Sequence, residues 1–215
     1  HYTDAVGLDA GSVSTATDQV ALATRAMENP VFAAIVAQPQ IHLPVAGTVF
    51  NYDYLVGHDG IVGVKTGSTG VAGGCFVFAA HRVILGHDRV IVGAVLGQRG
   101  ASELQAALSA SKALIDAVPP LVHPVTVLAP GPVGRVTTQW GATSEVATTT
   151  PVTVDGFAGL PYSVRVTTGR LGTSAPAGAQ VGTVTVTVVG QTFKVPATVT
   201  TAVHGPSVTW KLRRL

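Results

Sequence analysis

The stretch GIVGVKTGSTGVAGGCFVFAAHR, residues 60–82, joins two apolar runs through side chains that suit acyl-transfer chemistry. Lys65 offers an ammonium group, Thr66 offers a hydroxyl, and Gly67 has no Cβ, so another backbone can lie close to it. A cationic, hydroxyl-rich strand edge can stabilise negative charge that develops beside a nucleophile. The alternative is purely structural, because Gly-Ser-Thr-Gly is ordinary turn sequence between two strands.

The segments around this stretch predict a sheet. Three apolar runs, residues 60–67, 73–82 and 89–98, have strand character. They are separated by the short segments STGVA and VILGHD, so we expect consecutive antiparallel strands. Asp59 and Gly60 fit a turn before the first strand.

Helices are predicted before and after these strands in the sequence. STATDQVALATRAMENP begins with the cap-type residues Ser14 and Thr15 and stops before Pro30, and a short helix is expected in PVFAAIVAQ. After the strands, ASELQAALSASKALIDAV has apolar residues at helical spacing and ends before Pro119-Pro120.

Beyond these prolines the pattern changes. YSVRVTT, GTVTVTVVG, TFKVPATVT and SVTWKLRRL alternate apolar and polar residues, with Gly and Pro between the runs. We therefore expect a small all-β sandwich or barrel with a boundary near Val118, and a final strand in VTWKLRRL.

Composition excludes several classes of protein. The chain has 215 residues, of which 47% are hydrophobic and only 11% are charged, which is not a disordered composition. The net charge of +2 comes with no basic run, which argues against nucleic-acid binding. No apolar run is long enough to predict a membrane span.

Cysteine and histidine usage predicts neither a disulfide nor a metal site. The single cysteine, Cys75, cannot form an internal disulfide and is expected to be a small buried hydrophobe in the second strand. The seven histidines show no His-x-x-x-His or similar ligand spacing. We expect no metal and no other cofactor.

Several segments, in order along nearly the whole chain, resemble the D-alanyl-D-alanine carboxypeptidases, which are low-molecular-mass penicillin-binding proteins. The central one, GHDGIVGVKTGSTGVAGGCFVFAAHR, is similar to the VDGIKTG-x-T-x-x-AG segment of that family. HYTDAVGLD and STATDQVALATRAM match family segments upstream of it. LAPGPVGRVTTQWG and PAGAQVGTVTVTV resemble the β-rich domain that follows the catalytic domain.

The resemblance implies an α+β fold in residues 1–117, as the C-terminal part of a penicillin-binding-protein or β-lactamase-like catalytic domain, and an all-β domain in residues 118–215. It implies a serine enzyme that cleaves the D-Ala-D-Ala bond of peptidoglycan peptides through an acyl-enzyme and is inhibited by β-lactam antibiotics. Such a protein would be exported and would act in the cell envelope.

The resemblance also implies roles for five residues. Lys65 would supply positive potential and assist proton transfer near the nucleophile, and the backbone N–H of Ser68 would be one oxyanion-hole donor. Thr66 and Ser68 would offer hydroxyls to the terminal carboxylate of the substrate, and Gly67 would let the substrate backbone lie along the strand. Arg99, at the start of the following helix, would attract the same carboxylate.

The nucleophile that this family requires is not found in the expected place. The family has a Ser-x-x-Lys and a Ser-x-Asn before the Lys-Thr-Gly strand, and the sequence contains no Ser-x-Asn. Its one Ser-x-x-Lys, SASK from Ser109 to Lys112, lies after Lys65 within a predicted helix, so we expect a structural role for it. We therefore expect the chain to start partway through the enzyme and to pair with an N-terminal segment that holds the nucleophile.

Two other functions stay open at this point. A class A β-lactamase shares the Lys-Thr-Gly triplet but is normally a single catalytic domain, which leaves the β-rich half unexplained. A non-catalytic cell-wall-binding protein with the same fold is the second alternative. Any attachment to the membrane would have to come from segments outside this sequence.

Overall fold

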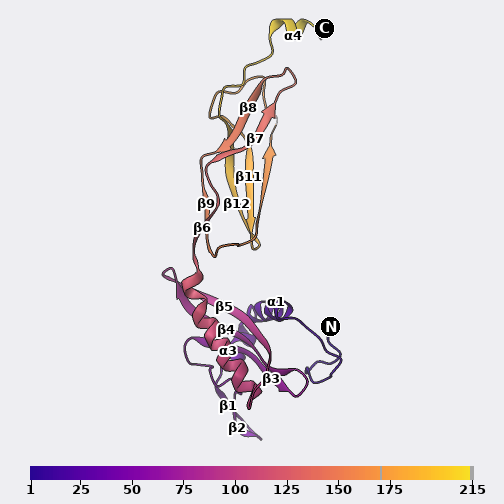
Figure 1. Cartoon of the computed structure of the whole chain (residues 1–215), viewed down its shortest axis with the longest axis vertical. Coiled ribbons are helices and arrows are strands. Elements are labelled where there is room, and N and C mark those ends of the chain that lie inside the picture. Colours follow the sequence, from indigo (N-terminus) through magenta and orange to yellow (C-terminus); the bar gives the residue numbers. More distant parts are fainter. Residues whose placement is uncertain (170, 214–215) are drawn as a thin grey trace. The chain divides into compact units, whose positions relative to one another are not determined.

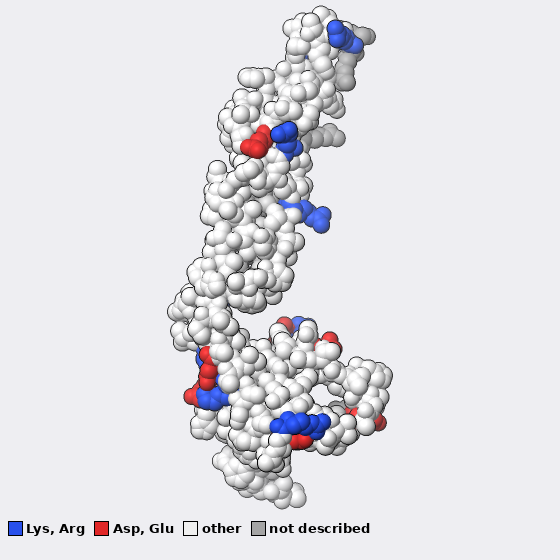
Figure 2. Space-filling model, in the orientation of Figure 1, with Lys and Arg blue, Asp and Glu red and all other residues white. Residues whose placement is uncertain are grey.

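The computed structural model describes residues 1–169 and 171–213. The chain divides into two compact units, His1–Val122 and His123–Leu215 (Figure 1). Each unit has a hydrophobic core of its own. Charged side chains are sparse on the face shown in Figure 2, in keeping with the low charged fraction of the sequence. No helix within the described ranges is long and apolar enough to cross a membrane.

The first unit combines helices with antiparallel strands. In chain order its elements are α1 (Ala16–Met27), α2 (Pro30–Val36), β1 (Gln40–Leu43), β2 (Gly47–Phe50), β3 (Ile61–Thr69), β4 (Gly73–Ile84), β5 (His87–Gln98), α3 (Glu103–Ala117) and the 3₁₀ turn η1 (Pro119–Leu121).

The three predicted helices of this unit are confirmed, and each begins at a capping side chain. The hydroxyl of Thr15 accepts a hydrogen bond from the backbone N–H of Asp18 at the start of α1. Asn29 caps α2, whose first residue is Pro30, and Ser102 caps α3. Such caps satisfy backbone donors that have no partner inside the helix.

The three predicted strands are also confirmed, as an antiparallel sheet in the order β3-β4-β5. β3 is an edge strand, and β4 is the central strand. Asp59 and Gly60 form the expected turn before β3, both with positive φ, and a Cβ at Gly60 would lie 2.6 Å from the carbonyl oxygen of His81. Glycine is therefore required at this turn.

The expected loop VILGHD is wrong in its extent. β4 and β5 continue through most of it and pair up to Ile84 and His87, which leaves Leu85 and Gly86 as a two-residue turn. Both turn residues have positive φ, 51° and 79°, as a type I′ hairpin turn requires. The Val-Ile segment before the turn therefore extends the apolar run of β4.

One face of the sheet packs against α3 to form the core of the first unit. The buried residues are Ile61, Phe76, Phe78 and Ala80 from the strands and Ala107, Leu108 and Ile115 from the helix. Two glycines allow this close packing. A Cβ at Gly93 would lie 2.2 Å from the ring of Phe78, and one at Gly74 would lie 1.8 Å from the carbonyl oxygen of Glu103. The first turn of α3 can therefore approach β4 directly.

Cys75 differs from its expected state, because it is only half-buried. It follows Gly74 in β4 and precedes the buried Phe76, so its side chain lies on the face of the sheet away from α3. In register it lies opposite Gly67 of β3.

The second unit is built almost entirely of strands. Its elements are β6 (His123–Leu128), β7 (Gly131–Thr137), β8 (Thr143–Thr148), β9 (Val152–Gly156), β10 (Tyr162–Thr168), β11 (Gln180–Val188), β12 (Gln191–Val199) and the short helix α4 (Val208–Leu212). β10-β11-β12-β8-β7 form one sheet and β6-β9 form another, and both contribute valines to one core. The predicted fold class, α+β followed by a small all-β domain, is confirmed.

The expected final strand in VTWKLRRL is wrong, because residues Val208–Leu212 form α4. The hydroxyl of Ser207 accepts a hydrogen bond from the N–H of Trp210 and caps the helix. Trp210 lies edge-on to Trp140, with 6.1 Å between ring centroids. The apolar and polar alternation is compatible with either structure over so few residues, and the cap favours the helix. Residues 214 and 215 of this segment lie outside the described residues.

Candidate functional site

The stretch from Lys65 to Ser68 lies on an open edge of the sheet. It belongs to β3, which pairs with β4 along one side and with no other strand among the described residues. Lys65, Gly67 and Ser68 are exposed, and Thr66 is half-buried. This strand edge can therefore accept an extended peptide as an additional strand.

The register of β3 and β4 divides these side chains between the two faces of the sheet. Thr66 lies opposite the buried Phe76, and Ser68 lies opposite Gly74, so both are on the α3 face. Lys65 is on the other face, and its Nζ donates a hydrogen bond to the backbone carbonyl oxygen of Thr66. The ammonium group and the hydroxyls thus flank the same strand edge from opposite sides.

Gly67 is not required by the fold. Its φ lies outside the left-handed region, and a Cβ built on it meets no atom of the described residues within 4 Å. Gly74, its neighbour across the strand pair, is required by packing, as described above. The glycine at position 67 therefore keeps the surface beside Lys65 clear without any benefit to the packing of this unit.

Ser68 belongs to a network that joins β3 to the start of α3. Its Oγ donates a hydrogen bond of 3.1 Å to Oε2 of Glu103, and Oε1 of Glu103 accepts a 2.8 Å hydrogen bond from Nη1 of Arg99. Arg99 also donates to the backbone oxygens of Gly70 and Val71, at 2.9 and 2.8 Å. The network therefore holds the β3–β4 turn against the first turn of α3.

Arg99 is thus near the predicted site, and part of its guanidinium is already used. Three of its five N–H groups donate to Gly70, Val71 and Glu103, while Nε and one N–H of Nη2 make no hydrogen bond among the described residues. The side chain is 57% exposed. Its role with a substrate carboxylate stays a prediction.

The Ser-x-x-Lys of α3 serves the structure. Lys112 Nζ lies 2.9 Å from carboxylate oxygens of both Asp59 and Asp116, and the hydrogen bond from Lys112 lowers the pKa of Asp116. Ser109 is exposed, and its Oγ accepts a 3.3 Å hydrogen bond from Nε2 of Gln105. The lysine therefore ties α3 to the turn before β3.

Two further residues were not predicted from the sequence, one bonded to Ser68 and one in the segment before β3. Glu103 has a recognisable signal, because it is an acidic residue in the first turn of a helix, where the helix dipole favours negative charge. Asp53 lies in the segment before β3 and is only 4% exposed. Its Oδ1 accepts from the N–H of Leu55, whereas its Oδ2 is buried and has no hydrogen-bond partner among the described residues. Burial raises the pKa of Asp53 to about 6. No pattern in the sequence marks this carboxylate as buried.

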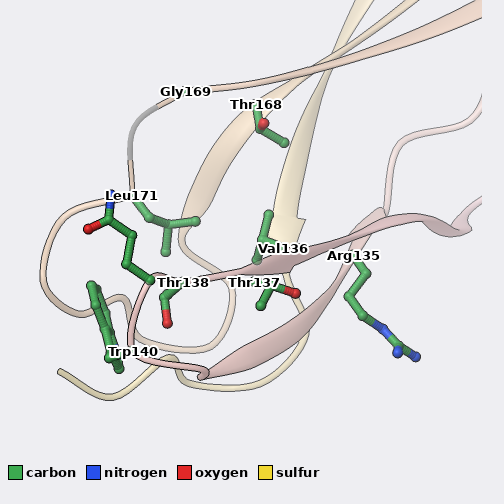
Figure 3. Close-up of a pocket in the computed structure, with 9 residues that line it drawn as sticks. Arg135, Val136, Thr137, Thr138, Trp140, Thr168, Gly169 and Leu171 are labelled. Atoms are coloured by element: carbon green, nitrogen blue, oxygen red, sulfur yellow. The ribbon is translucent and has the colours of Figure 1, made fainter. Parts of the chain in front are cut away.

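A separate hollow of about 770 Å³ lies on the second unit (Figure 3). Arg135, Thr137 and Trp140 contribute to its lining, together with Thr168 and Leu171. It contains none of the residues predicted for the site. Among the described residues, no group of three or more His, Cys, Asp or Glu side chains is placed to hold a metal ion.

The chain is similar in sequence to a known carboxypeptidase. No protein-family model matches the chain. A segment is 38% identical over 104 residues to the D-alanyl-D-alanine carboxypeptidase DacB2 of Mycobacterium tuberculosis, and covers 45% of this chain and 35% of that relative. The predicted resemblance to the D-alanyl-D-alanine carboxypeptidases is confirmed. The chain spans about a third of the length of this carboxypeptidase.

Solved structures of penicillin-binding proteins show distant, partial similarity. PBP3 of Streptococcus pneumoniae, a peptidoglycan synthesis regulatory factor, has a TM-score of 0.46 and 17% identity over 85% of this chain and 55% of its own. Penicillin-binding protein D2 of Listeria monocytogenes, in its cefotaxime-bound form, has a TM-score of 0.45 and 26% identity over 54% of this chain and 46% of its own.

Proposed function

We propose that this chain forms the Lys-Thr-Gly side of the active site in a serine-type D-alanyl-D-alanine carboxypeptidase that acts on peptidoglycan peptides. The observation that supports this most is the open edge of β3 at Lys65–Ser68, in a chain related to such a carboxypeptidase. An exposed lysine, two hydroxyls and a glycine without a packing role lie together on this edge.

In the proposed reaction the peptide lies along the β3 edge. A serine attacks the carbonyl carbon of the D-Ala-D-Ala bond, D-alanine leaves, and water hydrolyses the acyl-enzyme. Lys65 provides positive potential and assists proton transfer, and the backbone N–H of Ser68 binds the developing oxyanion. The hydroxyls of Thr66 and Ser68, with Arg99, bind the terminal carboxylate of the peptide. β-Lactam antibiotics would acylate the same serine.

We infer that the nucleophile lies outside these 215 residues. Within the described residues, the one Ser-x-x-Lys is on α3. Its Lys112 forms ion pairs with two carboxylates, and its Ser109 accepts a hydrogen bond from Gln105. A lysine held in this way by ion pairs is poorly suited to take a proton from a serine. We propose that residues 1–117 belong to the catalytic domain. Residues 118–215 would form a non-catalytic β domain in the cell envelope.

The test is D-alanine release from a peptide ending in D-Ala-D-Ala, measured with the full-length protein that contains these residues. Lys65→Ala should lower the rate by about 10²-fold or more, because it removes preorganised positive charge from the site. Lys112→Ala is the matched control. It removes the other lysine of a candidate motif and should leave the rate nearly unchanged. Equal rates for Lys65→Ala and the wild type would refute the assignment.

The same assay, combined with penicillin treatment of the protein, separates the two alternatives. A β-lactamase-like enzyme would turn over penicillin rapidly and release little D-alanine from the peptide. A non-catalytic wall-binding protein would neither release D-alanine nor form a covalent adduct with penicillin.

A further inference from the structure

Glu103 places a carboxylate between the two groups that, under the proposed function, bind the carboxylate of the substrate. One oxygen accepts from the Ser68 hydroxyl at 3.1 Å, and the other accepts from the Arg99 guanidinium at 2.8 Å. A peptide carboxylate bound by a hydroxyl and a guanidinium would make the same two kinds of hydrogen bond. The chain therefore already supplies a carboxylate for its own candidate anion site.

The backbone fixes Glu103 in this position. Ser102 caps α3, so Glu103 is the first residue of the helix. Gly74 lies opposite Ser68 in the register, and its missing Cβ leaves room for the backbone of Glu103 against β4. The Glu103 side chain is 23% exposed. Its contact with Ser68 is therefore a consequence of close packing between α3 and the sheet.

The contact with Ser68 distinguishes this arrangement from an ordinary ion pair. An exposed arginine and a glutamate close in sequence commonly pair, and such a pair contributes little to stability. A serine hydroxyl, however, has a single proton to donate. While Ser68 donates it to Glu103, it has none for a substrate carboxylate, and the negative charge of Glu103 repels a second carboxylate near Arg99.

We propose that Glu103 is an internal competitor for the terminal carboxylate of the substrate, which holds Ser68 and Arg99 until a peptide carboxylate replaces it. This inference rests on the proposed function. It predicts that Glu103 weakens substrate binding without affecting the chemical step, because the contact is lost before the bond is cleaved. It also predicts that the effect is confined to ligands with a carboxylate.

The experiment compares Glu103→Gln with the wild type in the full-length protein. Glutamine keeps the shape of the side chain and removes its charge. The Kd of a peptide ending in D-Ala-D-Ala, by calorimetry, and its KM should both fall by about two- to tenfold, with kcat unchanged. The same peptide with a C-terminal amide should show no change. Glu28→Gln, which removes the charge from the Arg25–Glu28 pair on the first helix, is the matched control and should change neither constant.

The outcomes separate this inference from the proposed function. Unchanged or weaker binding by Glu103→Gln, with Lys65→Ala inactive, would overturn the inference alone and make Glu103 a residue that positions Arg99. An equal gain for the acid and the amide peptide would also overturn it. Absence of any peptide binding by the wild type would overturn it too, and full activity of Lys65→Ala would overturn the proposed function.

Discussion

At the scale of single residues, Gly67 is a position where the need for glycine in substrate binding can be tested apart from any need for glycine in the fold. Neither its backbone conformation nor its packing requires glycine, since a Cβ would meet no atom within 4 Å in the part of the chain that the structure describes. The sequence was enough to predict a substrate-binding role for the glycine of the Lys-Thr-Gly triplet. Only the structure shows that the fold would accept a side chain at this position.

Gly67→Ala should therefore leave stability unchanged, or raise it by about 0.5 kcal/mol through the unfolded chain, and yet impair activity. A methyl group on the strand edge would displace the substrate backbone, which should reduce D-alanine release about tenfold or more. Thermal unfolding and the release assay give the two readouts. Gly74→Ala is the matched control, because its Cβ would lie 1.8 Å from the Glu103 carbonyl oxygen and should destabilise the protein instead. A stable, fully active Gly67→Ala variant would contradict a role in substrate binding.

Asp53 gives the first unit a specific pH dependence. Its folded pKa of about 6 is above the unfolded value of about 3.9, because burial disfavours the charged carboxylate. Below about pH 4 the group is protonated in both states and costs nothing. As pH rises to about 6, the unfolded state loses the proton first, so the folded state is destabilised by roughly 1–3 kcal/mol at pH 7.

Asp53→Asn should remove this dependence. We expect the free energy of unfolding of the wild type to fall, relative to that of the variant, between about pH 4 and pH 6, and the difference to be constant above that range. Urea unfolding at a series of pH values measures it. Parallel pH profiles for the two proteins would show that the carboxylate is solvated or paired in the folded state.

At the scale of elements, local sequence signals predicted most of the first unit. The cap-type Thr15, the helical spacing before Pro119 and the apolar runs of β3, β4 and β5 gave these helices and strands in the right order. The caps at Asn29 and Ser102 and the short strands β1 and β2 were not predicted. The errors fall where two structures share one local pattern. The Val-Ile pair before Leu85 was assigned to a loop, but it continues strand β4. The alternating residues Val208–Leu212 were assigned to a strand, but they form a helix capped by Ser207. The Ser68–Glu103 contact depends on how α3 packs, which local patterns do not specify.

A substitution in the β4–β5 turn should make the protein more stable, because the turn has a backbone conformation that its first residue disfavours. Leu85 has a φ of 51°, which disfavours a residue with a branched side chain, whereas asparagine tolerates this conformation. Leu85→Asn should raise the free energy of unfolding by about 0.5–1 kcal/mol, measured by thermal or urea unfolding. Leu85→Ala is the control, because alanine keeps the conformational penalty and should give no comparable gain. A less stable Leu85→Asn variant would mean that the exposed leucine makes a contact worth more than the turn.

At the scale of the whole molecule, the chain combines an α+β unit and an all-β unit, and the candidate site lies within the first. Under the proposed function, the Lys65 strand edge is one wall of a site whose nucleophile we place outside these 215 residues. Open edges and exposed apolar side chains in the first unit, such as Val31 and Ile35 on α2, are in keeping with that arrangement.

The central claim is that Lys65 serves a serine that is not among these residues. Its most direct test is to treat the full-length protein with benzylpenicillin, measure its intact mass and map the modified peptide. We expect one adduct, on a serine outside the 215 residues, and its loss in Lys65→Ala. An adduct on Ser109, or one that forms equally well without Lys65, would contradict the claim.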